Sequence, residues 1–112
     1  MAGKFEISKR SNGEFQFNLK AGNGQVILTS EGYTQMAGCT NGIESVRKHS
    51  ADDKFFQRKT AKDGSPYFTL VAGNGQVIGR SEMYSGNAAC ENGIASVKAN
   101  APDAAVVDLT GA

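Results

Sequence analysis

The chain repeats itself: residues 4–54 align on residues 55–105 at a constant offset, without insertion or deletion. The longest identical run occupies residues 21–27 and 72–78 and reads Ala-Gly-Asn-Gly-Gln-Val-Ile. Such a duplication predicts two copies of one supersecondary unit that pack about an approximate twofold axis. Because one copy would bury too little surface to be stable alone, we expect a single domain, residues 1–112, with a shared core.

Alternation of apolar and polar residues predicts three strands in each copy. In the first copy, one alternating run covers residues 4–9 and a second covers residues 15–21. Asn23-Gly24 is a favoured pair for a two-residue type I′ hairpin loop, and we expect it to lead into a third strand. That loop would direct Val26 and Leu28 to the inner face of the sheet and Ile27 to the outer face. In the second copy the same register directs Val77 inward and Ile78 outward.

A helix is predicted after the third strand of each copy. Thr34 and Ser85 are suitable N-caps, because their hydroxyls can accept the free backbone N–H groups of a first turn. Apolar residues then follow at helical spacing, and the helices should end near His49 and Asn100. The apolar stripes comprise Met36, Cys39, Ile43 and Val46 in the first copy and Cys90, Ile94 and Val97 in the second.

The repeat offset also predicts how the copies are joined. Two successive steps from the first strand reach residues 56–58 and then 107–109, so the two copies contain three strands in equivalent register. We therefore predict an α+β fold of the order βββα-βββα-β, with repeats at 4–54 and 55–105 and a closing strand at about 105–110. The sheet should be mainly antiparallel, with both helices on one face and the closing strands exchanged between the halves.

Composition argues against several function classes. The net charge is +1, and neither copy is strongly basic, which argues against nucleic-acid or membrane binding. No stretch approaches the roughly 20 apolar residues of a membrane span, and residues 1–6 lack an apolar signal-peptide core. We expect a cytoplasmic protein with reduced thiols. His49 is the only histidine and lies near no cysteine or carboxylate cluster, so we predict no metal, cofactor or catalytic set.

The order of the motifs resembles the YegP-like family, in its branch with two tandem copies. The motifs are Phe-x-Ile, Phe-x-Leu-x-Ala, Asn-Gly-x-x-Ile, Ser-Glu-x-Tyr and Asn-Gly-Ile-x-Ser-Val, and they extend from Phe5 to Leu109. The resemblance implies β(3)-α-β units that assemble one sheet with exchanged C-terminal strands. It also implies that single-copy members dimerise, so we expect this chain to be a monomer that imitates their dimer. The family is functionally uncharacterised, and the resemblance implies no catalytic residues.

Two pairs of small side chains on the predicted helices have competing interpretations. Cys39 and Cys90 lie on the apolar stripes, which favours core filling over a disulfide between them. Gly42 and Gly93 lie inside the helices, where glycine costs about 1 kcal/mol relative to alanine. They favour tight packing of the helix, with a ligand groove as the alternative.

Two surfaces are candidates for binding. The outer sheet face should carry apolar and basic side chains, namely Lys20, Ile27, Tyr67, Val71, Ile78 and Arg80. The segments that lead into the helices carry Glu31 and Tyr33 in the first copy and Glu82 and Tyr84 in the second. These four residues either stabilise the helix starts, where a carboxylate interacts favourably with the helix dipole, or line a polar site that is present twice.

We therefore expect a non-catalytic binding or interaction module that acts through the outer sheet face or a helix groove. Its partner, a protein or another molecule, is left open by the sequence. One alternative is weak binding of single-stranded nucleic acid, although only Tyr67 offers a ring for base stacking on the outer face. The other is an enzyme with symmetric Glu/Tyr pockets, which requires buried carboxylates with raised pKa values.

Overall fold

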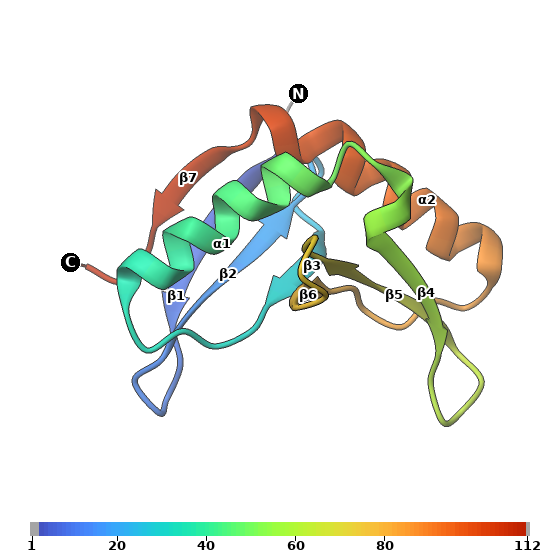
Figure 1. Ribbon diagram of the computed structural model, residues 1–112, viewed down its shortest axis with the longest axis horizontal. Helices are drawn as coiled ribbons and strands as arrows, with labels where there is room; N and C mark the ends of the chain where they lie inside the picture. Colours follow the sequence, from blue (N-terminus) through green and yellow to red (C-terminus); the bar gives the residue numbers. More distant parts are fainter. Residues whose placement is uncertain (1–2, 112) are drawn as a thin grey trace.

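A computed structural model describes residues 3–111 and shows one open mixed sheet with two helices on one face (Figure 1). The strands are β1 (Lys4–Lys9), β2 (Phe15–Lys20), β3 (Val26–Ser30), β4 (Phe56–Thr60), β5 (Pro66–Val71), β6 (Val77–Arg80) and β7 (Ala105–Asp108). The helices are α1 (Met36–His49) and α2 (Asn87–Asn100), and two 3-10 turns, η1 (Asp53–Phe55) and η2 (Ala101–Asp103), follow them. The strand order is β4-β5-β6-β3-β2-β1-β7, so β3 and β6 join the two halves at the centre.

One closing strand crosses between the halves, whereas the repeat predicted an exchange in both directions. After α1 the chain enters β4, which pairs antiparallel with β5 of the second copy. After α2 it enters β7, which pairs parallel with β1 of the first copy. The N–H of Leu109 donates to the carbonyl of Ile7 at 2.8 Å, and Arg47 Nη2 donates to the carbonyl of Ala104 at 2.6 Å. The first copy therefore depends on the strand that follows the second copy to complete its part of the sheet, while β4 remains at the open edge.

The hairpin between β2 and β3 differs from the predicted two-residue loop. The N–H of Gly24 donates to the carbonyl of Ala21, and the N–H of Ala21 donates to the carbonyl of Gln25, each at 2.9 Å. φ is +87° at Gly24, whereas no described residue other than glycine has a positive φ. This geometry is a three-residue loop in which a turn is followed by a left-handed glycine, not a type I′ turn.

The longer loop changes which side chains of β3 face the core. Val26 pairs with Lys20 on the outer face, and a β-bulge then restores the pairing of Leu28 with Leu19 on the inner face. Ile27, the extra residue at the bulge, also turns inward and is only 6% exposed. The predicted orientations of Val26 and Ile27 are therefore wrong, because a one-residue change of register moves a side chain to the opposite face.

The second copy differs from the predicted orientations in the same way. Val71 pairs with Val77 after a register shift, and Ile78 joins the core cluster at 5% exposure. Val77, which was predicted to face inward, is instead 37% exposed. The outer sheet face therefore lacks the two isoleucines that the sequence had assigned to it.

One core cluster includes buried side chains from both copies. Phe5 packs edge-on against Phe17 with ring centroids 5.7 Å apart, and Phe56 packs against Phe68 at the same distance. Cys39 and Cys90 are buried free thiols, which confirms their core-filling role, and burial raises the pKa of each thiol. Both helices lie on the same side of the sheet because the core residues of both copies form this one cluster.

The helix ends agree with the sequence, but the predicted caps do not. α1 and α2 end at His49 and Asn100, as expected. They begin after Gln35 and Gly86, and neither N-cap residue makes a side-chain capping bond. Thr34 and Ser85 are wrong as caps because each lies one position too early in the chain to reach the first turn.

Candidate functional site

A cleft lies between α1 of the first copy and the β5–β6 hairpin of the second. Its volume is about 740 Å³, which is within the range of small-molecule sites. The first copy contributes Glu31, Tyr33, Gly38, Asn41, Gly42 and Ser45, and the second contributes Ala72, Asn74, Gln76, Val77 and Ile78. We call this cleft 1.

An equivalent cleft lies between α2 and the β2–β3 hairpin, and we call it cleft 2. It consists of two adjoining hollows of about 370 and 240 Å³ that share Gln25, Ile27 and Tyr84. The second copy contributes Glu82, Met83, Tyr84, Ala89, Asn92, Gly93 and Ser96, and the first contributes Ala21, Asn23, Gln25, Val26 and Ile27. Each of the eleven residues of cleft 1 has its repeat equivalent in cleft 2, and ten of the eleven pairs are identical, Gly38 and Ala89 being the exception.

A tyrosine forms part of the wall of each cleft. The Tyr33 ring stacks on Phe17 at a centroid distance of 6.4 Å, and the Tyr84 ring stacks on Phe68 at 6.2 Å. A Cβ atom at Gly42 would overlap the Tyr33 hydroxyl, and one at Gly93 would overlap the Tyr84 hydroxyl. The glycines are therefore needed for close packing, as the first interpretation held, and they also line the clefts. Burial raises the pKa of both tyrosines, so each hydroxyl stays neutral near pH 7.

His49 connects the two walls of cleft 1. Its Nε2 accepts the backbone N–H of Gly73 at 3.2 Å, while its Nδ1 lies 2.8 Å from the carbonyl of Ser45. Because Nε2 accepts a hydrogen bond, the ring proton must reside on Nδ1, which donates to that carbonyl. In cleft 2, Asn100 occupies the equivalent position and donates to Ser96. The hairpin of the second copy is thus tied to α1 by a bond that has no counterpart at cleft 2 among the described residues.

The polar rim of each cleft is exposed and makes few internal bonds. Glu31, Asn41, Glu82 and Asn92 are exposed, and within residues 3–111 their side chains form no hydrogen bond or ion pair. Neither helix has an acidic residue in its first turn, so the helix-dipole explanation for Glu31 and Glu82 is wrong. The neighbouring Ser30 and Ser81 do have a structural role: their hydroxyls accept the N–H groups of Phe17 and Phe68 at 2.8 and 2.9 Å.

The outer sheet face retains only part of the predicted surface. Lys20 forms an ion pair with Glu6 at 2.8 Å, Tyr67 is half-buried and Val71 is only 7% exposed. Arg80 is exposed between Thr29 and Thr69 of the neighbouring strands. With Ile27 and Ile78 turned inward, these residues do not form the contiguous apolar and basic patch that a partner surface requires.

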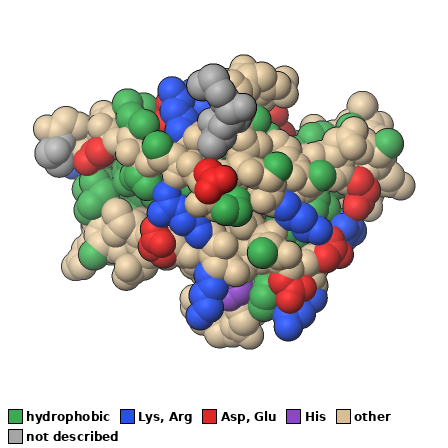
Figure 2. All heavy atoms as spheres, turned by 90° about the horizontal axis from the view of Figure 1, so that it is seen from above, with side chains coloured by type: hydrophobic (Ala, Val, Ile, Leu, Met, Phe, Trp, Pro, Cys, Tyr) green, Lys and Arg blue, Asp and Glu red, His purple; other side chains and the backbone are tan. Residues whose placement is uncertain are grey.

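The helix-bearing side is also not dominated by one kind of side chain. Figure 2 shows basic and acidic groups interspersed across it, in keeping with the net charge of +1.

Among the described residues no group of three or more His, Cys, Asp or Glu side chains is arranged to hold a metal ion. None of the described helices is both long enough and apolar enough to cross a membrane.

Comparison with known proteins assigns the chain to a family. A family model described as a domain of unknown function, DUF1508, matches it twice, at residues 11–56 and 61–108. The chain belongs to this family. The UPF0339 protein of Bordetella pertussis is 57% identical over 110 residues, which cover 98% of each chain, and the UPF0339 protein YegP of Escherichia coli O157:H7 is 52% identical over 98% of this chain and 100% of its own.

Solved structures of the family share the fold described above. The solution NMR structure of YegP from E. coli, a protein of unknown function, superimposes with a TM-score of 0.95 at 51% identity, covering 100% of this chain and 97% of its own. That of a UPF0339 protein from Shewanella oneidensis gives 0.92 at 52% identity, covering 98% and 93%. These relatives indicate no specific activity, and they confirm the YegP-like resemblance.

Sequence reasoning had named only part of each cleft. It selected Glu31, Tyr33, Glu82 and Tyr84, and it gave a ligand groove at Gly42 and Gly93 as an alternative, but it assigned Ile27 and Ile78 to a different surface. It did not connect the asparagines and serines of the helices with the hairpins. The available signal was the identical run at 21–27 and 72–78, which extends beyond what a hairpin loop requires.

Proposed function

We propose that this protein is a non-catalytic binding module with two equivalent ligand clefts, each built from both copies of the repeat. The observation that carries the proposal is the identity of ten of the eleven paired lining positions. Fewer than half of the 51 aligned positions in the two copies are identical. The two copies have therefore kept the cleft residues while much of the remainder diverged.

Folding alone does not account for this pattern. The exposed pairs Glu31/Glu82 and Asn41/Asn92 have no bonding partner among the described residues, so the fold does not require their identities. By contrast, some positions close to the core have changed: Leu28 corresponds to Gly79, and Ile7 corresponds to Arg58. A shared ligand would explain why exposed polar residues stayed the same while these positions varied.

The alternatives have less support. The enzyme hypothesis needs buried carboxylates, but Glu31 and Glu82 are both exposed. The nucleic-acid hypothesis needs aromatic rings on an open face, but Tyr67 is half-buried and Lys20 is already paired with Glu6. The proposal takes the protein to act as a monomer in the cytoplasm, and its two free, buried thiols are consistent with a reducing compartment.

Amide chemical-shift mapping on the ¹⁵N-labelled protein tests the proposal. The probes are a defined panel of small amines, carboxylates, sugars and neutral amides, each added to 20 mM. We expect at least one class to shift resonances of both clefts, with two equivalents bound per chain. Shifts confined to the outer sheet face, or no shifts with any class, would refute the proposal.

The repeat supplies the matched control. Asn41→Phe should fill cleft 1 and abolish its shifts while cleft 2 still responds, and Asn92→Phe should do the reverse. Thr40→Phe places the same ring on an exposed helix position that does not line the cleft, and it should leave both responses intact.

A further inference from the structure

Each cleft is lined by a single charged side chain, and in both cases it is a carboxylate. Within residues 3–111, Glu31 is the only charged residue that lines cleft 1, and Glu82 is the only one that lines cleft 2. No lysine, arginine or histidine of that range lines either cleft. The repeat has therefore placed one negative charge at the same point of two equivalent cavities.

These two carboxylates also differ from every other glutamate of the chain. The chain has six glutamates, and four of them form ion pairs: Glu6, Glu14, Glu44 and Glu91. Glu31 and Glu82 are the two that have no basic partner within residues 3–111. Three described aspartates, Asp63, Asp103 and Asp108, also form no ion pair, but none of them lines a cleft.

Two basic residues, Arg10 and Arg80, border a small hollow together with Glu31. Arg10 is already engaged. Its guanidinium donates to Gln16 at 2.6 Å and to the carbonyl of Ser30 at 3.3 Å, and it lies 3.8 Å from Glu14. The residue equivalent to Arg10 in the second copy is Ala61, so Glu82 lacks even this neighbour.

From this charge pattern we infer that both clefts bind a ligand that carries a protonated amine or a guanidinium on a short hydrocarbon chain. The inference rests on the proposed function and specifies its ligand. The carboxylate would pair with the cationic group by charge-assisted hydrogen bonds. Arg10 and Arg80 would partly offset the charge of Glu31, so cleft 2 should bind such a cation at least as tightly as cleft 1.

The rest of the lining suits the other parts of such a ligand. In cleft 1, the amide groups of Asn41 and Gln76 supply neutral acceptors for further N–H groups, whereas Asn74 Oδ1 already accepts the backbone N–H of Gln76 at 3.0 Å. Ala72, Val77 and Ile78 form an apolar wall against which methylene groups can pack. The neutral Tyr33 hydroxyl adds one acceptor without adding charge. An anionic ligand would meet a carboxylate with no compensating cation among the described residues that line either cleft.

Titration by amide chemical shifts distinguishes the ligand class and its source. Putrescine and agmatine represent free amines and guanidines, and the N-acetyl methylamides of lysine and arginine represent the same groups on a protein. 1,4-Butanediol and glutarate are the neutral and anionic controls. We expect the cations to shift both clefts at millimolar concentration, with binding that weakens as NaCl is raised, whereas the two controls produce no shifts.

Glutamine variants test the role of each carboxylate. Glu31→Gln should weaken cation binding at cleft 1 by about fivefold and leave cleft 2 unchanged, as expected for one exposed ionic contact, and Glu82→Gln should do the converse. Glu44→Gln removes an exposed glutamate that lines neither cleft, and it should change neither site. Unchanged backbone spectra would show that each variant is folded.

The outcomes separate this inference from the proposed function. If sugars, amides or carboxylates shift the clefts while cations do not, the binding function stands and the cationic ligand is wrong. If cations bind but Glu31→Gln and Glu82→Gln have no effect, the assigned recognition is wrong. If no compound shifts either cleft, both the inference and the proposed function are wrong.

Discussion

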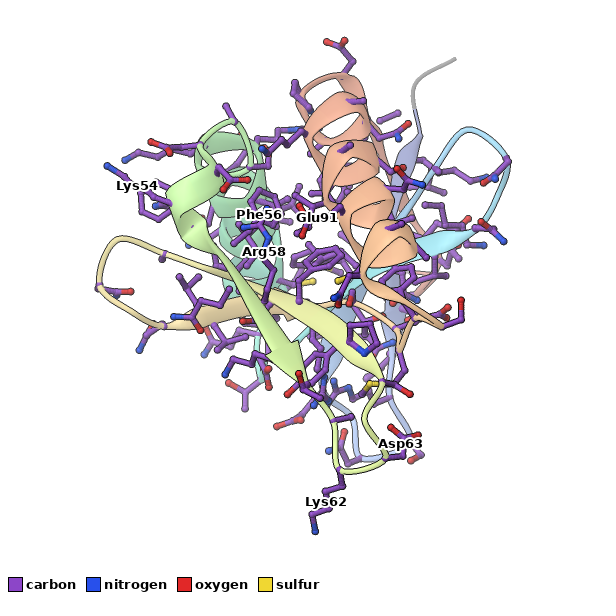
Figure 3. All side chains as sticks on the ribbon, turned by 90° about the vertical axis from the view of Figure 1, so that its right-hand side faces the viewer. Lys54, Phe56, Arg58, Lys62, Asp63 and Glu91 are labelled. Carbon is purple, nitrogen blue, oxygen red and sulfur yellow. The ribbon has the colours of Figure 1, made fainter. Side chains whose placement is uncertain are left out.

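Ile7 and Arg58 occupy equivalent positions in the two copies, yet Ile7 is 2% exposed and the side chain of Arg58 is 40% exposed. The difference follows from the closing strand. β1 has a strand on each side, because it pairs with both β2 and β7. β4 pairs with β5 alone among the described strands and forms the open edge of the sheet. Arg58 instead makes a bidentate pair with Glu91 of α2, at 2.6 and 2.8 Å, and both side chains lie beside β4 in Figure 3.

The backbone of Arg58 is free to accept a further strand. The N–H and carbonyl of Phe68, its partner in β5, are both directed to Ser81, at 2.9 Å in each case. In an antiparallel pair, the backbone groups of Arg58 must then point away from β5. A charged side chain on the core-facing side of such an edge discourages the addition of strands from other molecules.

Replacing each residue by its counterpart, in two separate variants, should change the stability by very unequal amounts. Ile7→Arg forces a charge into the core and removes buried apolar surface, so we expect a loss of more than about 3 kcal/mol in the free energy of unfolding. Arg58→Ile removes only exposed ion pairs and should change that free energy by less than about 1 kcal/mol. Urea denaturation measures both.

Arg58→Ile should have a different effect on association. With an isoleucine and free backbone groups at the edge, the variant should form concentration-dependent oligomers, detectable by size-exclusion chromatography with light scattering. Arg58→Lys, which keeps a charge there, serves as the control. A monomeric Arg58→Ile variant at millimolar concentration would contradict the protective role of this charge.

Asp53 predicts a specific acid dependence. Hydrogen bonds from Arg58 and Lys98 lower its pKa from 3.8 to about 2. A carboxylate whose pKa is lower in the folded state stabilises the fold above its unfolded pKa, and this contribution disappears as the pH falls from about 4 to 2. Carboxyl ¹³C titration should give a midpoint near 2 for Asp53. In Arg58→Met the midpoint should move back toward 3.8, and an unchanged midpoint would show that Arg58 is not its cause.

Gly42 should tolerate alanine poorly although it lies in a helix. Alanine normally stabilises a helix by about 1 kcal/mol over glycine, but a methyl group here would overlap the Tyr33 hydroxyl and lie 3.0 Å from Phe17. Overpacking of this kind typically costs about 1–3 kcal/mol, so we expect a net loss of stability in thermal denaturation. Gly38→Ala, which copies Ala89 of the second helix, is the control and should be nearly neutral. Adding Tyr33→Phe to Gly42→Ala should restore part of the loss, and no restoration would mean that the hydroxyl is not the obstacle.

Removing β7 should expose part of the first copy's core. A chain that ends at Asp103 loses the bonds of Leu109 to Ile7 and of Ala104 to Arg47, and it uncovers Ile7. Uncovering this one side chain should cost at least about 1.5 kcal/mol, measured by urea denaturation. A chain that ends at Thr110 keeps β7 and should be as stable as the full chain. Equal stability of the two truncated chains would contradict the structural role of the crossing strand.

The repeat allowed much of the fold to be predicted, because regular features lie close together in the sequence. Alternating residues in β1 and β2 and the apolar stripe of α1 define local periods that do not depend on distant contacts. The face of Ile27 was predicted wrongly, because Asn23-Gly24 is compatible with more than one loop length. The three-residue loop directs Ile27 toward α2, the helix of the other copy, and a contact between such distant segments cannot be read from local sequence.

The candidate site shows the same division. Glu31 and Tyr33 could be identified as candidates from the sequence alone, because the repeat has the same residues at Glu82 and Tyr84. Nothing in the sequence connects Asn41 with Asn74, which lie on different copies and meet only when the β5–β6 hairpin crosses to α1.

The sequence by itself determined that two copies exist, which residues they share and which local elements they form, because duplication and periodicity are properties of the chain order. Only the tertiary structure decided that the shared residues line two clefts between the copies and that β4, unlike β1, is left open. The physical reason is that a chain with two helices and seven strands has one closing strand fewer than the full symmetry requires. Packing between distant segments then assigns β7 to β1 and leaves Arg58 at the edge.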